Sequence, residues 1–287
     1  MYFIRETSER SDNKNTLKKA ILKNSNFKLI SFEGSPTIND NVTILMDKFK
    51  VDIDLSTTNK NDKIKIFNEL YRNSEFKDEF ALKKTIVENR KLKWGILVYD
   101  DNEYSLFFLK DGKEGRNFYK EFQNAKEFSN WLYENYSTIR YNISNYQEDN
   151  LPKYDISMRK NGKPWPGNVD GILLHNKKMI AVIEFQTTNK QSVREHNNND
   201  WWLPKYSRKG DKERWRSIYI NSNYLNLPII VGVWNPKEEE EYCIKLIKGF
   251  NFETDKPPFI FLKKKEIADD KNISIKLLEV LNINEKI

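Results

Sequence analysis

The chain has 287 residues, which suits one large domain or two modest ones, since domains commonly run to about 100–200 residues. Hydrophobic residues make up 38% and aromatic residues 13%, enough to bury a core, so the composition excludes a wholly disordered chain. Lys and Arg number 49 against 42 Asp and Glu, a formal charge of +7. This charge favours polyanionic partners, but it raises the expectation of nucleic-acid binding only slightly.

Cysteine usage and the distribution of apolar residues predict the compartment. Cys243 is the only cysteine, so the chain forms no internal disulfide, which suits a reducing environment. Residues 1–19 lack the apolar segment of a signal peptide, and no apolar run approaches the ~18–20 residues of a membrane span. We therefore expect a soluble, cytoplasmic protein with no membrane partner.

The first half of the chain predicts helices and strands in mixed order. Phe49, Val51, Ile53 and Leu55 alternate with polar residues, which indicates a half-buried strand. The expected elements are, in chain order, a helix over 14–24, strands over 27–32 and 42–55, helical structure over 62–90, a hairpin from 94–99 and 104–109, and an amphipathic helix over 124–136 that Asn124 can cap.

The second half predicts a hairpin, a helix and a buried strand in succession. The expected elements are a strand over 155–159, strands over 169–174 and 179–185 joined by a tight turn at 175–178, a helix over 211–226, strands over 228–234 and 259–262, and a terminal helix. This order predicts an α/β fold in which helices flank a mixed β-sheet. We expect an N-terminal α+β portion over 1–120 and a core over 121–287.

Two acidic residues stand at or within apolar strands of this hairpin. Asp170 precedes Gly-Ile-Leu-Leu, and Glu184 follows Ile-Ala-Val-Ile. An unpaired buried carboxylate is costly, so such residues normally have a cation or strong hydrogen-bond donors beside them. Strand alternation places Glu184 and Gln186 on one face, and the hairpin brings Asp170 level with them. The three side chains are therefore expected to converge.

Oxygen ligands presented in this way suit Mg²⁺, which binds through one or two carboxylates together with substrate phosphate oxygens. The ordinary structural interpretations are that Asp170 caps backbone groups beside Gly171 and that Glu184 forms an ion pair. The occurrence of both residues in register on one hairpin favours the metal site.

This arrangement resembles the PD-(D/E)xK nuclease superfamily, which has Asp on the first strand of a hairpin and Glu-x-Lys on the second and which includes most type II restriction endonucleases. The matching residues are Asp170, Glu184 and, at the lysine position, Gln186, as in a restriction-enzyme subgroup with a Glu-x-Gln ending. The resemblance covers about residues 150–236 and implies a restriction-endonuclease-like core. It implies metal ligation by Asp170, Glu184 and the Phe185 carbonyl.

Two departures from the family pattern affect the expected chemistry. Val169 stands where a proline usually precedes the aspartate, and Pro166 lies a few positions upstream. Gln186 has no charge and cannot act as a base, so its carbonyl is expected to orient the attacking water. A lysine from elsewhere in the chain, Lys190 or Lys205, is an alternative. A third acidic ligand is left open between Asp155, Glu148 and Glu134.

Polar and basic residues follow the hairpin. Those expected to contact DNA are Lys190, Arg194, Asn198, Lys205, Arg208, Lys209, Arg214 and Arg216. The alternative is an ordinary polar loop and a solvated charged face. Of the two histidines, His175 is expected to be exposed in the hairpin turn, and His196 lies nearer the site.

The resemblance implies a Mg²⁺-dependent endonuclease that cuts double-stranded DNA, a sequence-specific type II restriction enzyme acting as a homodimer. No nucleotide cofactor is expected, since the chain has no phosphate-binding glycine-rich motif. The alternatives are a repair or phage-defence nuclease of the same superfamily, and a catalytically inactive DNA-binding protein of that fold.

Overall fold

The computed structural model describes residues 2–6, 16–112, 117–137, 151–167, 169–198, 209–251 and 259–283. The chain divides into two compact units. Unit 1 comprises Met1–Asn13 and Phe32–Asn168, and unit 2 comprises Lys14–Ser31 and Val169–Ile287. Each unit is therefore assembled from two separate segments of the sequence.

Unit 1 contains a five-stranded sheet in the order β1-β5-β6-β7-β8. β5 and β6 are parallel, and the other neighbours are antiparallel. The strands are β1 (Phe3–Ile4), β5 (Leu45–Val51), β6 (Lys93–Tyr99), β7 (Ser105–Asp111) and β8 (Asn117–Phe122), and a separate hairpin joins β3 (Thr37–Ile38) to β4 (Asn41–Val42).

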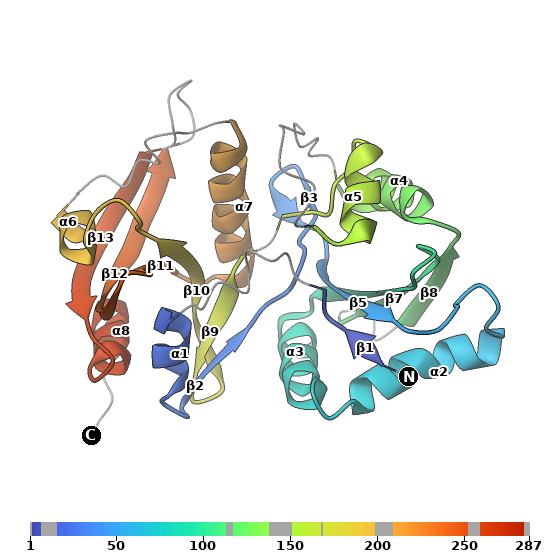
Figure 1. Cartoon of the computed structure of the whole chain (residues 1–287), viewed down its shortest axis with the longest axis horizontal. Coiled ribbons are helices and arrows are strands. Elements are labelled where there is room, and N and C mark those ends of the chain that lie inside the picture. Colours follow the sequence, from blue (N-terminus) through green and yellow to red (C-terminus); the bar gives the residue numbers. More distant parts are fainter. Residues whose placement is uncertain are drawn as a thin grey trace. The chain divides into compact units, whose positions relative to one another are not determined.

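Helices cover both faces of this sheet (Figure 1). α2 (Lys60–Arg72) and α3 (Lys77–Arg90) form the crossover between the parallel strands, and α4 (Ala125–Tyr136) and α5 (Lys153–Lys160) cover the other face. The Asn124 side chain accepts the Glu127 N–H at 2.9 Å, which confirms the predicted cap of α4. Phe128 and Leu132 of α4 are fully buried in a core shared with α5 and the sheet.

A buried ion pair holds the crossover helix α3 to the sheet of unit 1. Asp47 of β5 is wholly buried, and its two carboxylate oxygens accept hydrogen bonds from Lys83 Nζ at 2.7 Å and from Trp94 Nε1 at 2.8 Å. Lys83 of α3, also wholly buried, contacts Glu79 at 2.6 Å. Every charge in this group has a partner, as buried ions require.

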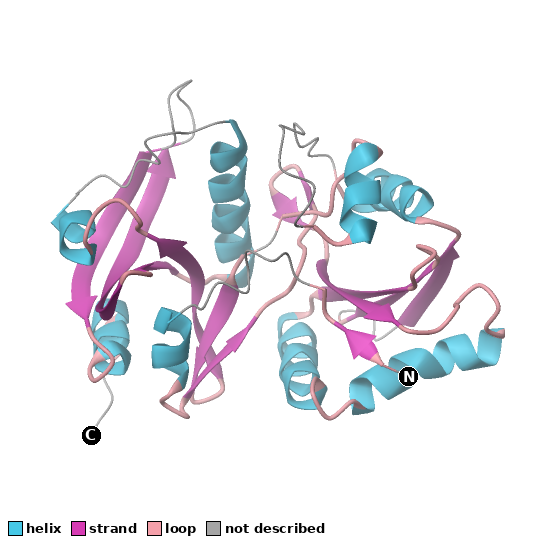
Figure 2. Cartoon of the chain, in the orientation of Figure 1, coloured by secondary structure: helices cyan, strands magenta, loops and turns pink. Residues whose placement is uncertain are grey.

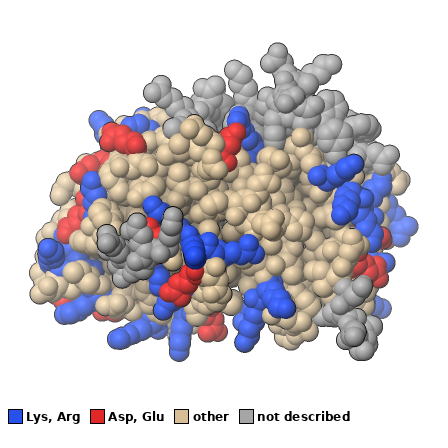
Figure 3. Space-filling view, turned by 180° about the vertical axis from the view of Figure 1, so that it is seen from behind, with Lys and Arg blue, Asp and Glu red and all other residues tan. Residues whose placement is uncertain are grey.

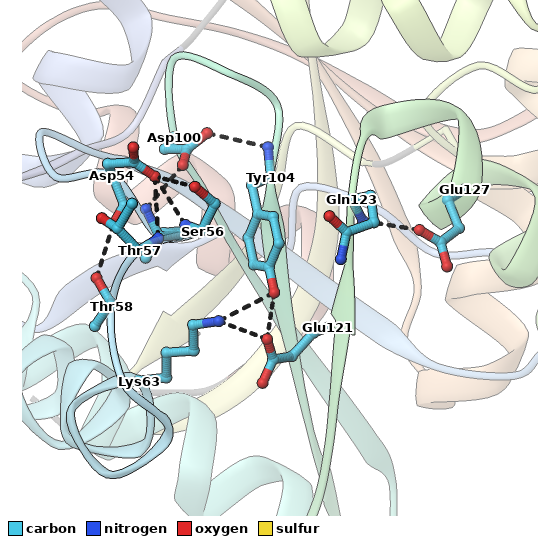
Figure 4. A network of polar contacts seen from close by, with 11 residues as sticks. Asp54, Ser56, Thr57, Thr58, Lys63, Asp100, Tyr104, Glu121, Gln123 and Glu127 are labelled. Carbon is cyan, nitrogen blue, oxygen red and sulfur yellow. Dashed lines mark hydrogen bonds and ion pairs between the residues drawn. The ribbon is translucent and has the colours of Figure 1, made fainter.

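A second polar network fixes α2 to β8 and to Tyr104, which immediately precedes β7 (Figure 4). Lys63 Nζ lies 2.6 Å from Glu121 Oε2 and 3.0 Å from the Tyr104 hydroxyl, which also contacts Glu121. Asp100 accepts the backbone N–H groups of Leu55 and Tyr104 at 2.9 and 3.0 Å. Lys63, Tyr104 and Glu121 satisfy one another, and backbone groups satisfy Asp100, so we interpret the network as structural.

Unit 2 contains a six-stranded sheet in the order β13-β12-β11-β10-β9-β2 (Figure 2). Only β10 and β11 are parallel neighbours, so the sheet is mixed. The strands are β2 (Phe27–Ile30), β9 (Gly171–His175), β10 (Lys178–Thr187), β11 (Ile229–Asn235), β12 (Glu238–Asn251) and β13 (Phe259–Ala268).

Four helices flank the sheet of unit 2. α1 (Thr16–Leu22) and α8 (Ile273–Leu281) bury apolar side chains with Ile183 and Ile230 on one face. α6 (Val193–Asn198) and α7 (Lys209–Leu225) lie on the other face, where α6 contacts Lys245 and α7 contacts Glu184. α7 forms the crossover between the parallel strands β10 and β11. Across the described residues, no helix is both long enough and apolar enough to traverse a bilayer.

The structure confirms the expected α/β class, with mixed sheets flanked by helices, but differs in its division. The expected boundary after residue 120 does not match the two units, since α4 and α5 belong to unit 1 and α1 belongs to unit 2. The strand expected over 155–159 is wrong: Tyr154 and Met158, one helical turn apart, are the buried residues of α5.

Three further differences concern strands. β5 was expected to be half buried, but nearly all of its side chains are buried, including the charged Asp47 and Lys48. Sequence periodicity did not indicate β8 or β12. β12 begins with four consecutive glutamates, which give no alternation of apolar and polar residues.

Candidate functional site

The hairpin of β9 and β10 places Asp170 and Glu184 side by side. Its two-residue turn, Asn176-Lys177, has φ values of 50° and 65°, the left-handed conformation that such tight hairpins use. Gly171 pairs with Ile183 in the antiparallel register. Continuing that register by one position puts Asp170 opposite Glu184, and opposite residues of an antiparallel pair project from the same face.

Asp170 immediately precedes β9, and its side chain accepts a hydrogen bond from the backbone of β10. Its Oδ2 accepts the N–H of Phe185 at 2.7 Å. The N–H and C=O of one strand residue leave the strand on the same side, so the Phe185 carbonyl is directed toward Asp170. Asp170 is exposed as a residue, but burial of its carboxyl group raises the pKa of Asp170. The charge of Arg214, the hydrogen bond from Phe185 and the charge of Lys18 oppose this rise.

Glu184 is the buried member of the pair, with 1% of its surface exposed. It follows Ala181, Val182 and Ile183, which are wholly buried. Its Oε1 forms an ion pair with Arg214 Nη2 of α7, and Oε2 has no hydrogen-bond partner among the described residues. A buried carboxylate oxygen without a donor is costly, and a bound cation would satisfy it.

The same guanidinium acts on both carboxylates. Arg214 pairs with Glu184, and its charge opposes the rise that burial causes in the pKa of Asp170. The two carboxyl groups therefore lie within electrostatic reach of one cation. Together with the Phe185 carbonyl they form an all-oxygen donor set, which fits Mg²⁺ or another hard divalent cation.

Gln186 lies two residues beyond Glu184 and so projects from the same face of β10. It is half buried and pairs in register with Val233 of β11. β10 is regular over 182–187 in its pairing with β11, so Gln186 shares the face of Glu184, and the convergence of the three side chains stays a prediction.

Neither of the two described candidates for the third acidic ligand belongs to unit 2, which contains this hairpin. Asp155 belongs to α5 of unit 1, where it forms an ion pair with Lys48, and Glu134 is exposed on α4 of the same unit. Glu148 lies outside the described residues. In the part of the chain that the structure describes, no three His, Cys, Asp or Glu residues cluster as a metal site.

The residues expected to contact DNA have mixed outcomes. Arg194 of α6 pairs with Glu241, with Nε 2.8 and 3.0 Å from its two oxygens, and Arg214 contacts Glu184. Lys190 and Asn198 are exposed, and Arg216 of α7 is half buried. Lys209 begins α7, whereas Lys205 and Arg208 lie outside the described residues.

The two histidines are both buried. His175 was expected to be exposed, but it ends β9 and packs on Phe27 with ring centroids 4.7 Å apart. His196 lies within α6, where burial and the nearby Lys245 lower its pKa to about 4. Neither is an obvious proton donor to the hairpin.

Lys245 is the residue on this face that sequence reasoning missed. It lies on β12 in register with Val231, which in turn pairs with Glu184, so all three occupy one row across the sheet. Lys245 is 1% exposed and donates to the His196 carbonyl at 2.8 Å. The signal was a charged residue between Ile244 and Leu246, the same signal that identified Glu184.

Charged side chains are dispersed over the surface drawn in Figure 3. On that face, Lys and Arg form several separate groups, and Asp or Glu lie beside some of them. This distribution agrees with the modest charge excess of 49 basic over 42 acidic residues. The charge on this face alone therefore does not mark it as functional.

Comparison with known proteins gives no functional assignment. The chain matches no protein-family model and no curated protein. Among solved structures, it is faintly similar to the C-terminal domain of the sex pheromone staph-cAM373 precursor from Staphylococcus aureus, with 8% identity and a TM-score of 0.16. The match covers 78% of this chain and 65% of that one, just under two thirds of its length. So low a TM-score carries no argument about fold or function.

Proposed function

We propose that this protein is a Mg²⁺-dependent endonuclease that hydrolyses phosphodiester bonds in double-stranded DNA, with Asp170, Glu184 and the Phe185 carbonyl as metal ligands. The observation that carries the proposal is the pair of carboxylates on one hairpin, of which the buried one has an oxygen without a donor. An oxygen donor set in this state is suited to a hard cation.

The surrounding elements support the same proposal. The resemblance to PD-(D/E)xK nucleases rests on Asp170, Glu184 and Gln186, and it anticipates a helix and a further strand after the hairpin. α7 and the parallel strand β11 occupy those positions. This agreement is one of topology and motif, and the activity itself is argued from the site.

Each residue has a separate task in the proposed reaction. Asp170, Glu184 and the Phe185 carbonyl would hold the cation, and Gln186 would orient a water through its side-chain carbonyl. When bound, Mg²⁺ would neutralise charge on the phosphodiester and lower the pKa of a coordinated water.

A plasmid digest tests the proposal. Supercoiled plasmid incubated with the protein and Mg²⁺ should give discrete fragments, as expected of a sequence-specific restriction enzyme. Heterogeneous degradation would favour a repair or phage-defence nuclease. Asp170→Ala and Glu184→Ala should abolish cutting, and Glu279→Gln, an exposed ion-pair variant on α8 across the sheet, should retain it. Cutting that survives either alanine substitution would remove the site assignment.

A catalytically inactive DNA-binding protein is the second candidate, and Gln186 is the observation that favours it, because glutamine lacks the charge of the family lysine. Intact but electrophoretically shifted plasmid in the same digest would establish that alternative.

We also propose a cytoplasmic homodimer, since a two-fold symmetric DNA site is matched by a two-fold symmetric protein. Light scattering of the purified protein, at micromolar concentration, should give twice the mass of the chain. A monomeric mass with full cutting activity would contradict this part of the proposal.

A further inference from the structure

Arg214 occupies the position of a cation at the candidate metal site. Its Nη2 contacts Glu184 Oε1, and its charge also acts on Asp170. No other ion pair of Glu184 exists among the described residues, so the guanidinium is the charge that compensates this buried carboxylate there. It leaves Oε2 without a donor, which makes the compensation incomplete.

The attachment of α7 does not depend on this contact. Trp215 and Ile218 of α7 are 2% and 0% exposed, and Trp215 packs on Phe250 of β12 with ring centroids 5.7 Å apart. The Arg214 side chain, by contrast, is 48% exposed. The guanidinium can therefore turn into solvent by side-chain rotation while the helix stays in place.

Simultaneous binding of a divalent cation and a guanidinium to the Glu184 carboxylate is unfavourable in free energy. Both are positive, and like charges a few ångströms apart repel strongly where little water screens them. A cation that binds Asp170, Glu184 and the Phe185 carbonyl brings two charges where Arg214 supplies one. The exposed guanidinium is the group that can leave.

We propose that Arg214 is a resident counter-cation that the metal displaces from Glu184, and that the released guanidinium binds a phosphate oxygen of DNA. The inference rests on the proposed function, since it concerns the same site. Its consequence is reciprocal: the metal strengthens DNA binding because it frees Arg214, and DNA strengthens metal binding because it holds Arg214 away from Glu184. A planar guanidinium is well suited to phosphate oxygens.

Calorimetric titration with Mn²⁺ alone, without DNA, tests the displacement. Removal of the competing charge in Arg214→Gln should tighten Mn²⁺ binding about tenfold relative to the wild type. Lys276→Gln is the matched control, because it removes one positive charge from an ion pair on α8, across the sheet. That control should leave the Mn²⁺ affinity within about twofold of the wild type, since surface charges are largely screened.

A second titration tests the coupling to DNA. Binding of a fluorescent duplex of ~30 base pairs is measured by anisotropy in Ca²⁺ and in chelator, with Ca²⁺ taken to support binding without cleavage. The wild type should bind more tightly in Ca²⁺, and Arg214→Gln should lose most of that difference. An undiminished difference in the variant would overturn the coupling.

The outcomes separate this inference from the proposed function. Unchanged or weaker Mn²⁺ binding by Arg214→Gln, with binding abolished by Glu184→Gln, would overturn the displacement and leave the metal site standing. Absence of Mn²⁺ binding in the wild type, or binding that Glu184→Gln does not affect, would remove the metal site and the inference with it.

A measurement on the wild type covers the case in which Arg214→Gln does not fold. In protein labelled with ¹⁵N-arginine, the Arg214 Nε–H signal, assigned by comparison with Arg214→Lys, should shift when Mg²⁺ is added. A signal that stays in place at saturating Mg²⁺ would overturn the displacement.

Discussion

The two units each bury a carboxylate on a strand that pairs in parallel with its neighbour, and they stabilise it differently. In unit 1, both oxygens of Asp47 accept hydrogen bonds, from Lys83 at 2.7 Å and Trp94 at 2.8 Å. In unit 2, Glu184 has one ion pair with a half-exposed arginine, and its Oε2 has no donor among the described residues. Protein groups satisfy both oxygens of Asp47, whereas one oxygen of Glu184 is left for a ligand to satisfy.

This difference separates a structural charge from a candidate functional one. Burial alone does not, because Asp47 and Glu184 are 0% and 1% exposed. A buried ion that is fully hydrogen-bonded serves the packing of its unit, whereas an incompletely paired one is costly and is retained where function needs it. The comparison predicts opposite responses to the same kind of substitution.

The largest expected effect is the loss of cutting in Glu184→Gln. Removal of a metal-ligating charge should lower the cleavage rate on the order of 1,000-fold, equivalent to about 4 kcal/mol of transition-state stabilisation. The free energy of unfolding in chelator should stay the same or rise, because an incompletely paired buried charge has been removed. Single-turnover plasmid cleavage and urea unfolding measure the two quantities. A large loss of stability would make Glu184 another structural charge.

Substitution in unit 1 should do the reverse. Lys83→Met leaves the buried Asp47 with Trp94 as its remaining donor and should cost about 3–5 kcal/mol of unfolding free energy, measured by urea denaturation. Lys65→Met, which removes an exposed partner of Asp62, is the control and should change the midpoint little. If both variants have wild-type midpoints, the ionic pair in unit 1 contributes nothing to stability.

Gln186→Ala tests whether Gln186 orients water or binds the metal in unit 2. A residue that orients water without binding metal should lower the cleavage rate about 10–100-fold and leave the Mn²⁺ affinity unchanged. Single-turnover cleavage and calorimetry measure the two effects separately. Weakened Mn²⁺ binding would instead place Gln186 among the metal ligands.

The smallest expected effect is a pH dependence in unit 1. Burial and the negative charge of Asp47 raise the pKa of Glu33 to about 7, although Lys48, Arg5 and Lys83 oppose this shift. The folded state thus favours protonated Glu33. The stability that this protonation contributes is full below about pH 4.5 and is lost as the pH rises through about 7. Glu33→Gln should be more stable than the wild type at pH 8, by about 1–2 kcal/mol, and match it near pH 4.5.

Denaturation of Glu33→Gln and the wild type at several pH values would measure this dependence. A constant difference between the two across the range would show that Glu33 titrates as it does in the unfolded chain.

Local sequence patterns predicted the elements whose signal lies within the element. The hairpin of β9 and β10, the cap of α4 at Asn124 and the crossover helix α7 follow from turn residues, capping residues and periodicity. β12 did not, because its initial glutamates hide the alternation. The division of the chain was not predicted either, because contacts between residues distant in sequence place α1 and β2 in unit 2.

The candidate site shows the same limit. The alternation within Glu184-Phe185-Gln186 and the hairpin predicted that the site residues share one face. The contact of Arg214 with Glu184 spans 30 positions of the chain, and no local pattern predicts which basic residue of α7 faces a given strand residue. Asp155 was one of three candidate acidic ligands from earlier elements, and in the structure it lies on a helix of unit 1 and pairs with Lys48.

Anomalous X-ray diffraction from a crystal soaked in Mn²⁺ tests the central claim most directly, because it locates the cation itself. We predict an anomalous peak within about 2.5 Å of Glu184 Oε2 and one oxygen of Asp170, with Arg214 turned away from Glu184. A peak elsewhere, with the Arg214–Glu184 contact intact, would show that these two carboxylates do not form a metal site.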